Sequence, residues 1–307
     1  MSKKVMVVMG GFSSEQKVSR NSGRDIVEAL KSKGYEVITH DLTDSWDFIE
    51  ALKKEKPEVV FNGLYGNWGE DGEIQGVLDF LQIPYTHSGL KASALGMDKF
   101  LTKYIARENG IKVAECEKMT ARDYFEYGTK INFPYVVKPV CDGSSVGVFI
   151  VHNEEDKAKV FYKDPDEEVL VEEFIPGHEL TVMVLNGKAH VVTELKAKVE
   201  FYNYKAKYTD GVTEHILPAE IPETAAKTCM AYAEKLHRKI GCRNLSRVDF
   251  RYNEKDDVVL LEINTNPGLT TLSLVPEQAR YIGISYADLC EQLVETATCR
   301  KIQPLNL

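Results

Sequence analysis

The chain has 307 residues, of which 43% are apolar, so it can bury large cores and is long enough for about two domains. Its net charge is −9 at pH 7 without any block of lysine or arginine, which argues against nucleic acid as a partner. The longest apolar runs, such as Val5–Met9, are too short to cross a membrane. The six cysteines form no Cys-x-x-Cys pair, which is typical of reduced thiols in a cytoplasmic protein.

Apolar strands and helical segments alternate along the whole chain, a pattern that predicts an α/β fold. In the first unit, residues 1–93, the expected strands are Val5–Met9, Glu36–His40 and Glu58–Asn62. One expected helix of this unit ends at Lys33–Gly34. Two more cover Trp46–Lys54 and Glu73–Leu81. We expect an open parallel sheet of Rossmann-like topology, without the Gly-x-Gly-x-x-Gly motif of dinucleotide sites.

Two further units follow in the same alternating pattern. For the second, residues 94–178, the predicted elements are the helix Met97–Asn109 and the strands Tyr135–Lys138, Val146–Val151 and Val169–Phe174. For the third, residues 179–307, they are the hairpin Leu180–Leu185 with Ala189–Lys196, the helix Glu223–Ile240, a second hairpin and the helix Tyr286–Lys301. The long segment Glu200–Pro222 lacks periodicity, and such a loop in a compact domain is usually functional, often a lid.

The second hairpin of the third unit carries a candidate metal site. Two apolar strands flank the polar turn Asn253–Asp257, and a simple closure of that turn would place Asp249 roughly opposite Glu262. With Asn264, these side chains offer the oxygen ligands that Mg²⁺ prefers, and Arg247 adds a guanidinium. The alternative is a solvent-exposed acidic hairpin followed by ordinary turn chemistry.

A candidate phosphate site follows the strand that ends in Lys138. The loop Gly143–Gly147 is built from small residues, which let backbone N–H groups approach an anion, and Lys138 adds a point charge. Downstream, an apolar strand ends in Glu172 and Glu173, and such a segment would hold an adenine by its backbone and a ribose by a carboxylate. The alternatives are a plain turn and a strand end with solvated acids.

Taken together, these segments resemble the D-alanine–D-alanine ligases, which are members of the ATP-grasp superfamily. The resemblance runs nearly from end to end and is implied by the number, order and spacing of its motifs. The motifs are Gly10–Glu15, Gly69–Gly72, Ile83–Tyr85, Met97–Lys99, Lys138–Pro139, Gly143–Gly147, Lys207–Tyr208, Arg247–Asp249, Glu262–Thr270 and Ser273–Pro276. It implies a three-domain ATP-grasp architecture and the ATP-dependent joining of two D-alanines through a D-alanyl phosphate, for peptidoglycan precursor synthesis.

The resemblance also assigns roles to residues. Lys99 and Lys138 would hold the α- and β-phosphates of ATP, and Lys207 would reach the γ-phosphate. The rest of the ATP site would consist of Ser145, Glu172, Glu173, Ile175 through its backbone, and Glu179. Two Mg²⁺ ions, with Mn²⁺ as a substitute, would bind to Asp249, Glu262 and Asn264.

For the amino-acid substrates, Glu15 would bind the ammonium of the first D-alanine, and Ser273 and the Leu274 N–H the carboxylate of the second. Arg247 and the Gly268 N–H would stabilise the tetrahedral oxyanion. Glu15, Ser144 and Tyr208 would form a hydrogen-bonded chain that holds the lid closed and keeps water from the acylphosphate. The family also suggests a homodimer.

Some positions depart from the family pattern. Tyr65 stands where histidine is common and His87 where glycine is usual, and both are expected near the substrate. His178 replaces a common arginine and is expected to be a surface variation. Cys141 lies close to Lys138, whose charge would favour the thiolate.

Two other functions remain open. One is a ligase of the same fold with a different acceptor, such as D-lactate, D-serine or another amino acid. The other is a non-catalytic nucleotide-binding regulator, which would have no need of Arg247, Asp249, Glu262 and Asn264.

Overall fold

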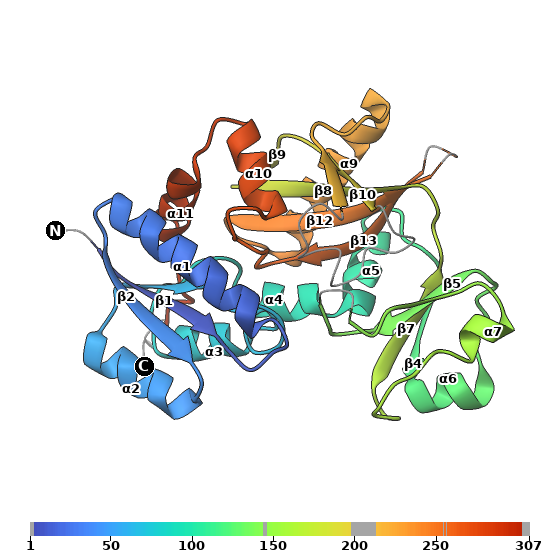
Figure 1. The fold of residues 1–307 in the computed structure, drawn as a ribbon, viewed down its shortest axis with the longest axis horizontal. Helices are drawn as coiled ribbons and strands as arrows, with labels where there is room; N and C mark the ends of the chain where they lie inside the picture. Colours follow the sequence, from blue (N-terminus) through green and yellow to red (C-terminus); the bar gives the residue numbers. More distant parts are fainter. Residues whose placement is uncertain (1–2, 144–145, 198–212, 254, 256, 303–307) are drawn as a thin grey trace, which may run out of the picture.

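The computed structural model describes residues 3–143, 146–197, 213–253, 255 and 257–302. Within these residues the strands form three sheets, arranged along the chain as an N-terminal, a middle and a C-terminal sheet (Figure 1). The predicted α/β class and the N-terminal parallel sheet are confirmed. Among the described helices, none is both long and apolar enough to cross a bilayer.

The N-terminal sheet is parallel, in the order β2–β1–β3. Its strands are β1 (Lys4–Gly10), β2 (Glu36–Leu42) and β3 (Val59–Asn62), and its helices are α1 (Gln16–Ser32), α2 (Ser45–Glu55), α3 (Glu73–Phe80) and α4 (Leu90–Met97). The central strand β1 is buried along almost its whole length, which accounts for its continuous apolar run. The loops that follow β1 and β3 leave from the same edge of this sheet, where ligands bind in open α/β sheets.

The middle sheet is antiparallel, in the order β4–β7–β5–β6. Its strands are β4 (Cys116–Thr120), β5 (Tyr135–Pro139), β6 (Phe149–Val151) and β7 (Glu168–Glu173), and the helices beside them are α5 (Lys99–Glu108), α6 (Ala121–Tyr127) and α7 (Glu154–Lys157). Tyr124 and Tyr135 form its buried centre, with their hydroxyl oxygens 3.0 Å apart.

The C-terminal sheet has the order β11–β10–β8–β12–β13, and β9 also pairs with β8. The strands are β8 (His178–Leu185), β9 (Lys188–Ala189), β10 (Thr193–Ala197), β11 (Thr213–Ile216), β12 (Leu245–Tyr252) and β13 (Val258–Asn264); the helices are α9 (Glu223–Ile240), α10 (Leu274–Tyr281) and α11 (Tyr286–Glu295). Strand β8 alternates between two cores, because Val182 and Val184 pack with α9 whereas Met183 and Leu185 pack with α10 and α11.

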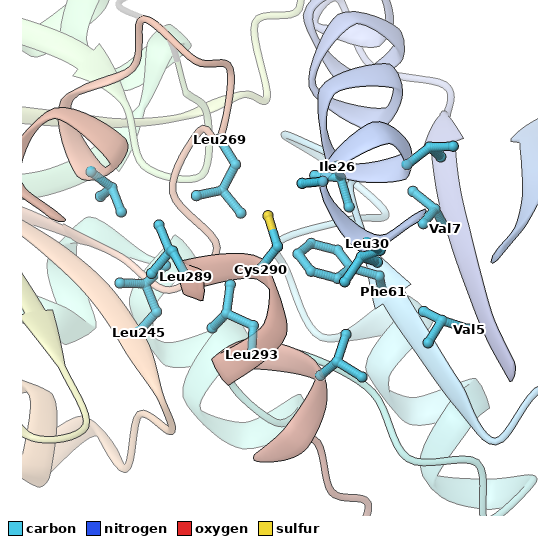
Figure 2. Packing of buried hydrophobic residues seen from close by; sticks show 14 of the residues in the cluster. Val5, Val7, Ile26, Leu30, Phe61, Leu245, Leu269, Leu289, Cys290 and Leu293 are labelled. Atoms are coloured by element: carbon cyan, nitrogen blue, oxygen red, sulfur yellow. The ribbon is translucent and has the colours of Figure 1, made fainter. Parts of the chain in front are cut away.

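Helix α11 ties the C-terminal sheet to the N-terminal one. Its residues Cys290 and Leu293 lie between Leu245 on one side and Phe61 and Leu30 on the other (Figure 2). This core crosses the predicted boundaries, so the division into residues 1–93, 94–178 and 179–307 stays a prediction.

Several element boundaries differ from the expectations. The helix predicted to start at Met97 begins at Lys99, because the Asp98 side chain accepts the Leu101 N–H and caps it. The sequence reading missed α10 and the strand β11, which lies inside the segment predicted to be irregular. The last helix ends at Glu295 and β6 begins only at Phe149, so both are shorter than predicted.

A buried ion cluster joins α5 to the middle sheet. The carboxylate of Glu172 lies 2.5 Å from Lys138 Nζ and 2.9 Å from Lys103 Nζ, and all three side chains are at least nine-tenths buried. Burial opposes the ionisation of Glu172, but the two lysines outweigh it and lower the pKa of this carboxyl to about 2.

Replacing Glu172 should therefore destabilise the protein strongly. A Glu172→Gln change leaves two buried ammonium groups without a counterion, which costs on the order of 3 kcal/mol of unfolding free energy. Because the folded pKa is lowered, the stabilisation by Glu172 is present above its ordinary pKa of 4.5 and is lost as the pH falls toward about 2. Urea unfolding at pH 7 measures the effect, with the exposed neighbour Glu173→Gln as control. Equal urea midpoints for Glu172→Gln and Glu173→Gln would contradict this stabilising role of Glu172.

Candidate active site

A cleft of about 630 Å³ is lined by residues from all three parts of the fold. Most of the described residues predicted to form the site meet there: Glu15, Lys99, Lys138, Glu172, Glu173, Ile175, Glu179, Arg247, Asp249, Glu262, Asn264, Gly268 and Leu274. Ser273 lies next to this set, and its hydroxyl accepts the Thr270 N–H at 3.1 Å. The predicted residues Ser144, Ser145, Lys207 and Tyr208 lie outside the described residues, as does most of the predicted lid.

The β12–β13 hairpin places Asp249 opposite Glu262, as predicted, but for a different reason. Near the turn, Phe250 pairs with Leu260, and regular pairing would next oppose Asp249 to Leu261. A β-bulge lets β13 gain one residue there, so that Asp249 pairs with Glu262 and Arg247 with Asn264. The strands close the turn as predicted, with Tyr252 paired to Val258, and the bulge further along the strands brings Asp249 directly opposite Glu262.

The carboxylate of Asp249 is held by hydrogen bonds from three neighbouring side chains. Its carboxylate accepts from Arg247 Nε at 3.0 Å and Nη2 at 2.8 Å, from Thr181 Oγ1 at 2.6 Å and from Asn264 Nδ2 at 3.1 Å. These donors fix the position of the carboxyl group between a guanidinium and an amide.

Two lysines stand on the side of the cleft that the middle part of the fold provides. Lys99 is the first residue of α5, and its ammonium lies 3.8 Å from Glu262 and donates to the Asp142 carbonyl. Lys138 reaches the cleft from β5 and pairs with Glu172. The positive end of α5 reinforces the charge of Lys99, which suits an anionic ligand.

Glu15 enters from the loop after β1, where it precedes α1, and is nine-tenths buried. The phosphate-loop candidate approaches it closely, because a Cβ atom added at Gly143 would lie 3.3 Å from Glu15 Oε2. A Cβ atom added at Gly66 would lie 3.2 Å from the same oxygen, and Gly66 has a φ of +69°, a conformation that suits glycine.

The sequence reading assigned no role to two residues that line the cleft beside Glu15. Burial, reinforced by Glu15, raises the pKa of Glu70 well above its usual range. Tyr65, noted only as a departure, accepts the Leu269 N–H at 3.0 Å and so braces the turn that carries Gly268. The motif Gly69–Gly72 contained the signal for Glu70, but nothing in the pattern placed it near Glu15.

Arg251 and Glu194 also line the cleft and were not singled out from the sequence. Arg251 shares its face of β12 with Arg247 and Asp249, so strand alternation was a usable signal for it. Glu194 is buried and lies 2.7 Å from His178 Nδ1, which places His178 at the edge of the cleft with 42% of its side chain exposed.

Two further positions differ from expectation. His87 is buried with a φ of +67°, which accounts for the glycine usual there, and it is not among the residues that line the cleft. At Cys141, desolvation and the nearby Asp98 raise the pKa of the thiol despite Lys99, which is the opposite direction to the expected one.

The comparisons agree with this geometry. Residues 105–295 match the family model described as D-ala D-ala ligase C-terminus. The D-alanine–D-alanine ligase of Ruegeria sp. is 44% identical over 97% of this chain and 97% of that protein. The corresponding ligase of Zymomonas mobilis is 47% identical over 96% of this chain and 94% of its own length.

Solved structures give the same result. A D-alanine–D-alanine ligase from Bacillus anthracis, complexed with ATP, superposes with a TM-score of 0.83 at 32% identity, covering 96% of this chain and 97% of that one. The VanG D-Ala:D-Ser ligase from Enterococcus faecalis superposes with a TM-score of 0.79 at 26% identity, covering 96% of this chain and 99% of its own. The chain therefore belongs to the D-alanine–D-alanine ligase family and has the three-part ATP-grasp architecture of its members.

Proposed function

We propose that the cleft joins two D-alanines to D-alanyl-D-alanine, with ATP converted to ADP and phosphate, for peptidoglycan precursor synthesis. One observation carries this proposal: the hairpin residues Arg247, Asp249 and Glu262 share a cleft with the lysines of α5 and β5 and with Glu15 of the N-terminal loop. A nucleotide-binding regulator would need the lysines but not this combination of acids and Arg247.

ATP would lie between the middle and C-terminal sheets. Lys99 and Lys138 supply the positive charge for its phosphates, and Glu179 offers a carboxylate to its ribose. Among the described residues, none accepts a hydrogen bond from the Ile175 N–H, so this donor is available to the base. Ser145 and Lys207 would complete the site by family resemblance.

The oxygen atoms that the β12–β13 hairpin offers as ligands suit Mg²⁺. No group of three or more His, Cys, Asp or Glu side chains in the described residues is arranged to hold a metal by itself. Asp249 and Glu262 with the amide of Asn264 offer the small oxygen set that Mg²⁺ combines with phosphate oxygens. Bound Mg²⁺, or Mn²⁺ in its place, would neutralise the charge of the triphosphate.

The amino-acid substrates would occupy the end of the cleft near Glu15. Glu15 would bind the ammonium of the first D-alanine and direct its carboxylate toward the ATP phosphates. Arg247 and the Gly268 N–H would stabilise the oxyanion when the second amine attacks the acylphosphate, while Ser273 and the Leu274 N–H hold the second carboxylate. Ser144 and Tyr208 would secure the lid, which excludes water.

The metal assignment predicts the effect of Glu262→Gln. Turnover should fall by at least about a hundredfold at equal Mg²⁺, because a neutral amide cannot replace a bridging carboxylate. The control is Asp257→Asn, which lies in the same hairpin but pairs with Lys112 away from the cleft. A Glu262→Gln enzyme within threefold of the wild type would refute the assignment.

The identity of the acceptor substrate needs its own test, because the VanG ligase shares this fold and is named for a D-Ala:D-Ser activity. At pH 7 we expect dipeptide from D-alanine and negligible depsipeptide from D-lactate, since the family's lid tyrosine, here Tyr208, accompanies amine acceptors. Product analysis with D-alanine, D-serine and D-lactate between pH 6 and pH 9 measures this. Abundant depsipeptide would favour a ligase that uses D-lactate as its acceptor. ATP turnover that none of these acceptors changes would favour the non-catalytic nucleotide-binding regulator.

A homodimer is supported by exposed apolar side chains on α3 and α4. Val77, Phe80, Leu81 and Leu90 are 39%, 82%, 39% and 46% exposed, and these four residues are not part of the cleft lining. Phe80→Glu should convert the protein to a monomer in sedimentation at micromolar concentration. Phe161→Glu, at another exposed phenylalanine, in the middle part, should not. A wild-type monomer would rule the dimer out.

A further inference from the structure

The connection between the middle and C-terminal sheets is short and lies in the cleft. Strand β7 ends at Glu173 and β8 begins at His178, so residues 174–177 join two strands of different sheets. Phe174, Ile175 and Gly177 all line the cleft. The conformation of this crossover therefore sets how the two walls of the cleft face each other.

One side chain from β12 holds this crossover. Arg251 Nε donates to the Ile175 carbonyl at 2.9 Å, and Nη2 donates to the Gly177 carbonyl at 2.8 Å. Its third nitrogen, Nη1, lies 3.3 Å from the carboxylate of Glu179. Every nitrogen of the guanidinium thus has a protein partner within a five-residue stretch.

The backbone of β12 approaches the same stretch independently. A Cβ atom added at Gly177 would lie 2.1 Å from the Tyr252 carbonyl oxygen, and Gly177 has a φ of +105°. Glycine is therefore required for the crossover to lie this close to the end of β12. The strand register agrees, because Arg251 pairs with Glu179 and Tyr252 with His178.

We propose that Arg251 is a positioning residue for the nucleotide, and this inference rests on the proposed ATP site. By occupying the carbonyls of Ile175 and Gly177, it orients the Ile175 amide toward the base. By pairing with Glu179, it orients the carboxylate that receives the ribose. The hydrogen bonds of Arg251 go to the crossover and to Glu179, so we propose that it acts on the nucleotide through these groups.

The chemistry of arginine is required for this role. A planar guanidinium can satisfy three acceptors that diverge from one another, whereas the ammonium of lysine is a single compact donor group on a flexible stem. Loss of the fork leaves two carbonyls and a carboxylate to rearrange at the base and ribose end. The phosphate end of the cleft, formed by Lys99 and Lys138, keeps its own contacts.

Calorimetric titration with ADP and with tripolyphosphate, both in the presence of Mg²⁺, tests the proposal. Arg251→Met should weaken ADP binding at least about tenfold, and Arg251→Lys should have an intermediate effect. Tripolyphosphate should bind all forms with affinities within about threefold of the wild type, because it has neither base nor ribose. In steady-state assays the KM for ATP should rise while kcat and the KM for D-alanine change little. The control is Arg122→Met, an exposed arginine that pairs with Asp166 on the middle part.

The outcomes separate this inference from the proposed function. A wild-type protein that does not bind ADP would overturn the ATP site itself. Normal ADP binding by the wild type and by a folded Arg251→Met or Arg251→Lys variant would overturn only the role of Arg251. Equal losses for ADP and tripolyphosphate would show a general effect on folding and would also overturn it. If Arg251→Met does not fold, the affinities of Arg251→Lys for ADP and tripolyphosphate test the role of Arg251, because this variant keeps the positive charge.

Discussion

A single extra residue in β13 determines which face of the C-terminal sheet carries Glu262. Side chains alternate along a strand, so a shift of one residue exchanges the two faces. Without the bulge at Leu261, Glu262 would pair with Val248, whose side chain packs in the core against α9. The bulge turns Glu262 to the cleft and pairs it with Asp249. The acid set, and with it the proposed metal site, depends on this irregularity.

Charge is distributed in the cleft in a way that suits a large anion with a cation. The cations Lys99, Lys138 and Arg247 and the acids Asp249 and Glu262 line one space together with Glu15 and Glu70. Neither sign dominates, so a triphosphate alone would meet acids and a metal alone would meet lysines. The two ligands together would satisfy both sets, which is the physical basis for coupled binding of ATP and Mg²⁺ at such a site.

The cleft is assembled from parts that are far apart in the chain, and its walls are held by different kinds of contact. Helix α11 returns to the N-terminal sheet and buries apolar residues there. The middle part is joined to the rest by the Lys103–Glu172–Lys138 ion cluster, in which Lys103 also donates to the Leu260 carbonyl of β13 at 3.1 Å. The crossover held by Arg251 is the third such link. Apolar burial links the N-terminal part to the C-terminal sheet. Between the middle part and the C-terminal sheet, the ion cluster and the crossover add directed polar contacts to the apolar packing of Ala106 and Ile111.

Much of this protein was determined by local sequence pattern. Alternation of strands and helices predicted the α/β class, and the motifs around Lys138, Arg247 and Glu262 predicted most of the cleft, because strand periodicity and family spacing are local properties. The β-bulge, helix α10, the cleft position of Glu70 and the contacts of Arg251 were not predictable in this way. Each depends on how a segment packs against another that is distant in sequence, and the packing free energy that selects those pairings is absent from any local pattern. Lys103 shows this most clearly: in the sequence it is one more helical lysine, and only the tertiary structure buries it against Glu172.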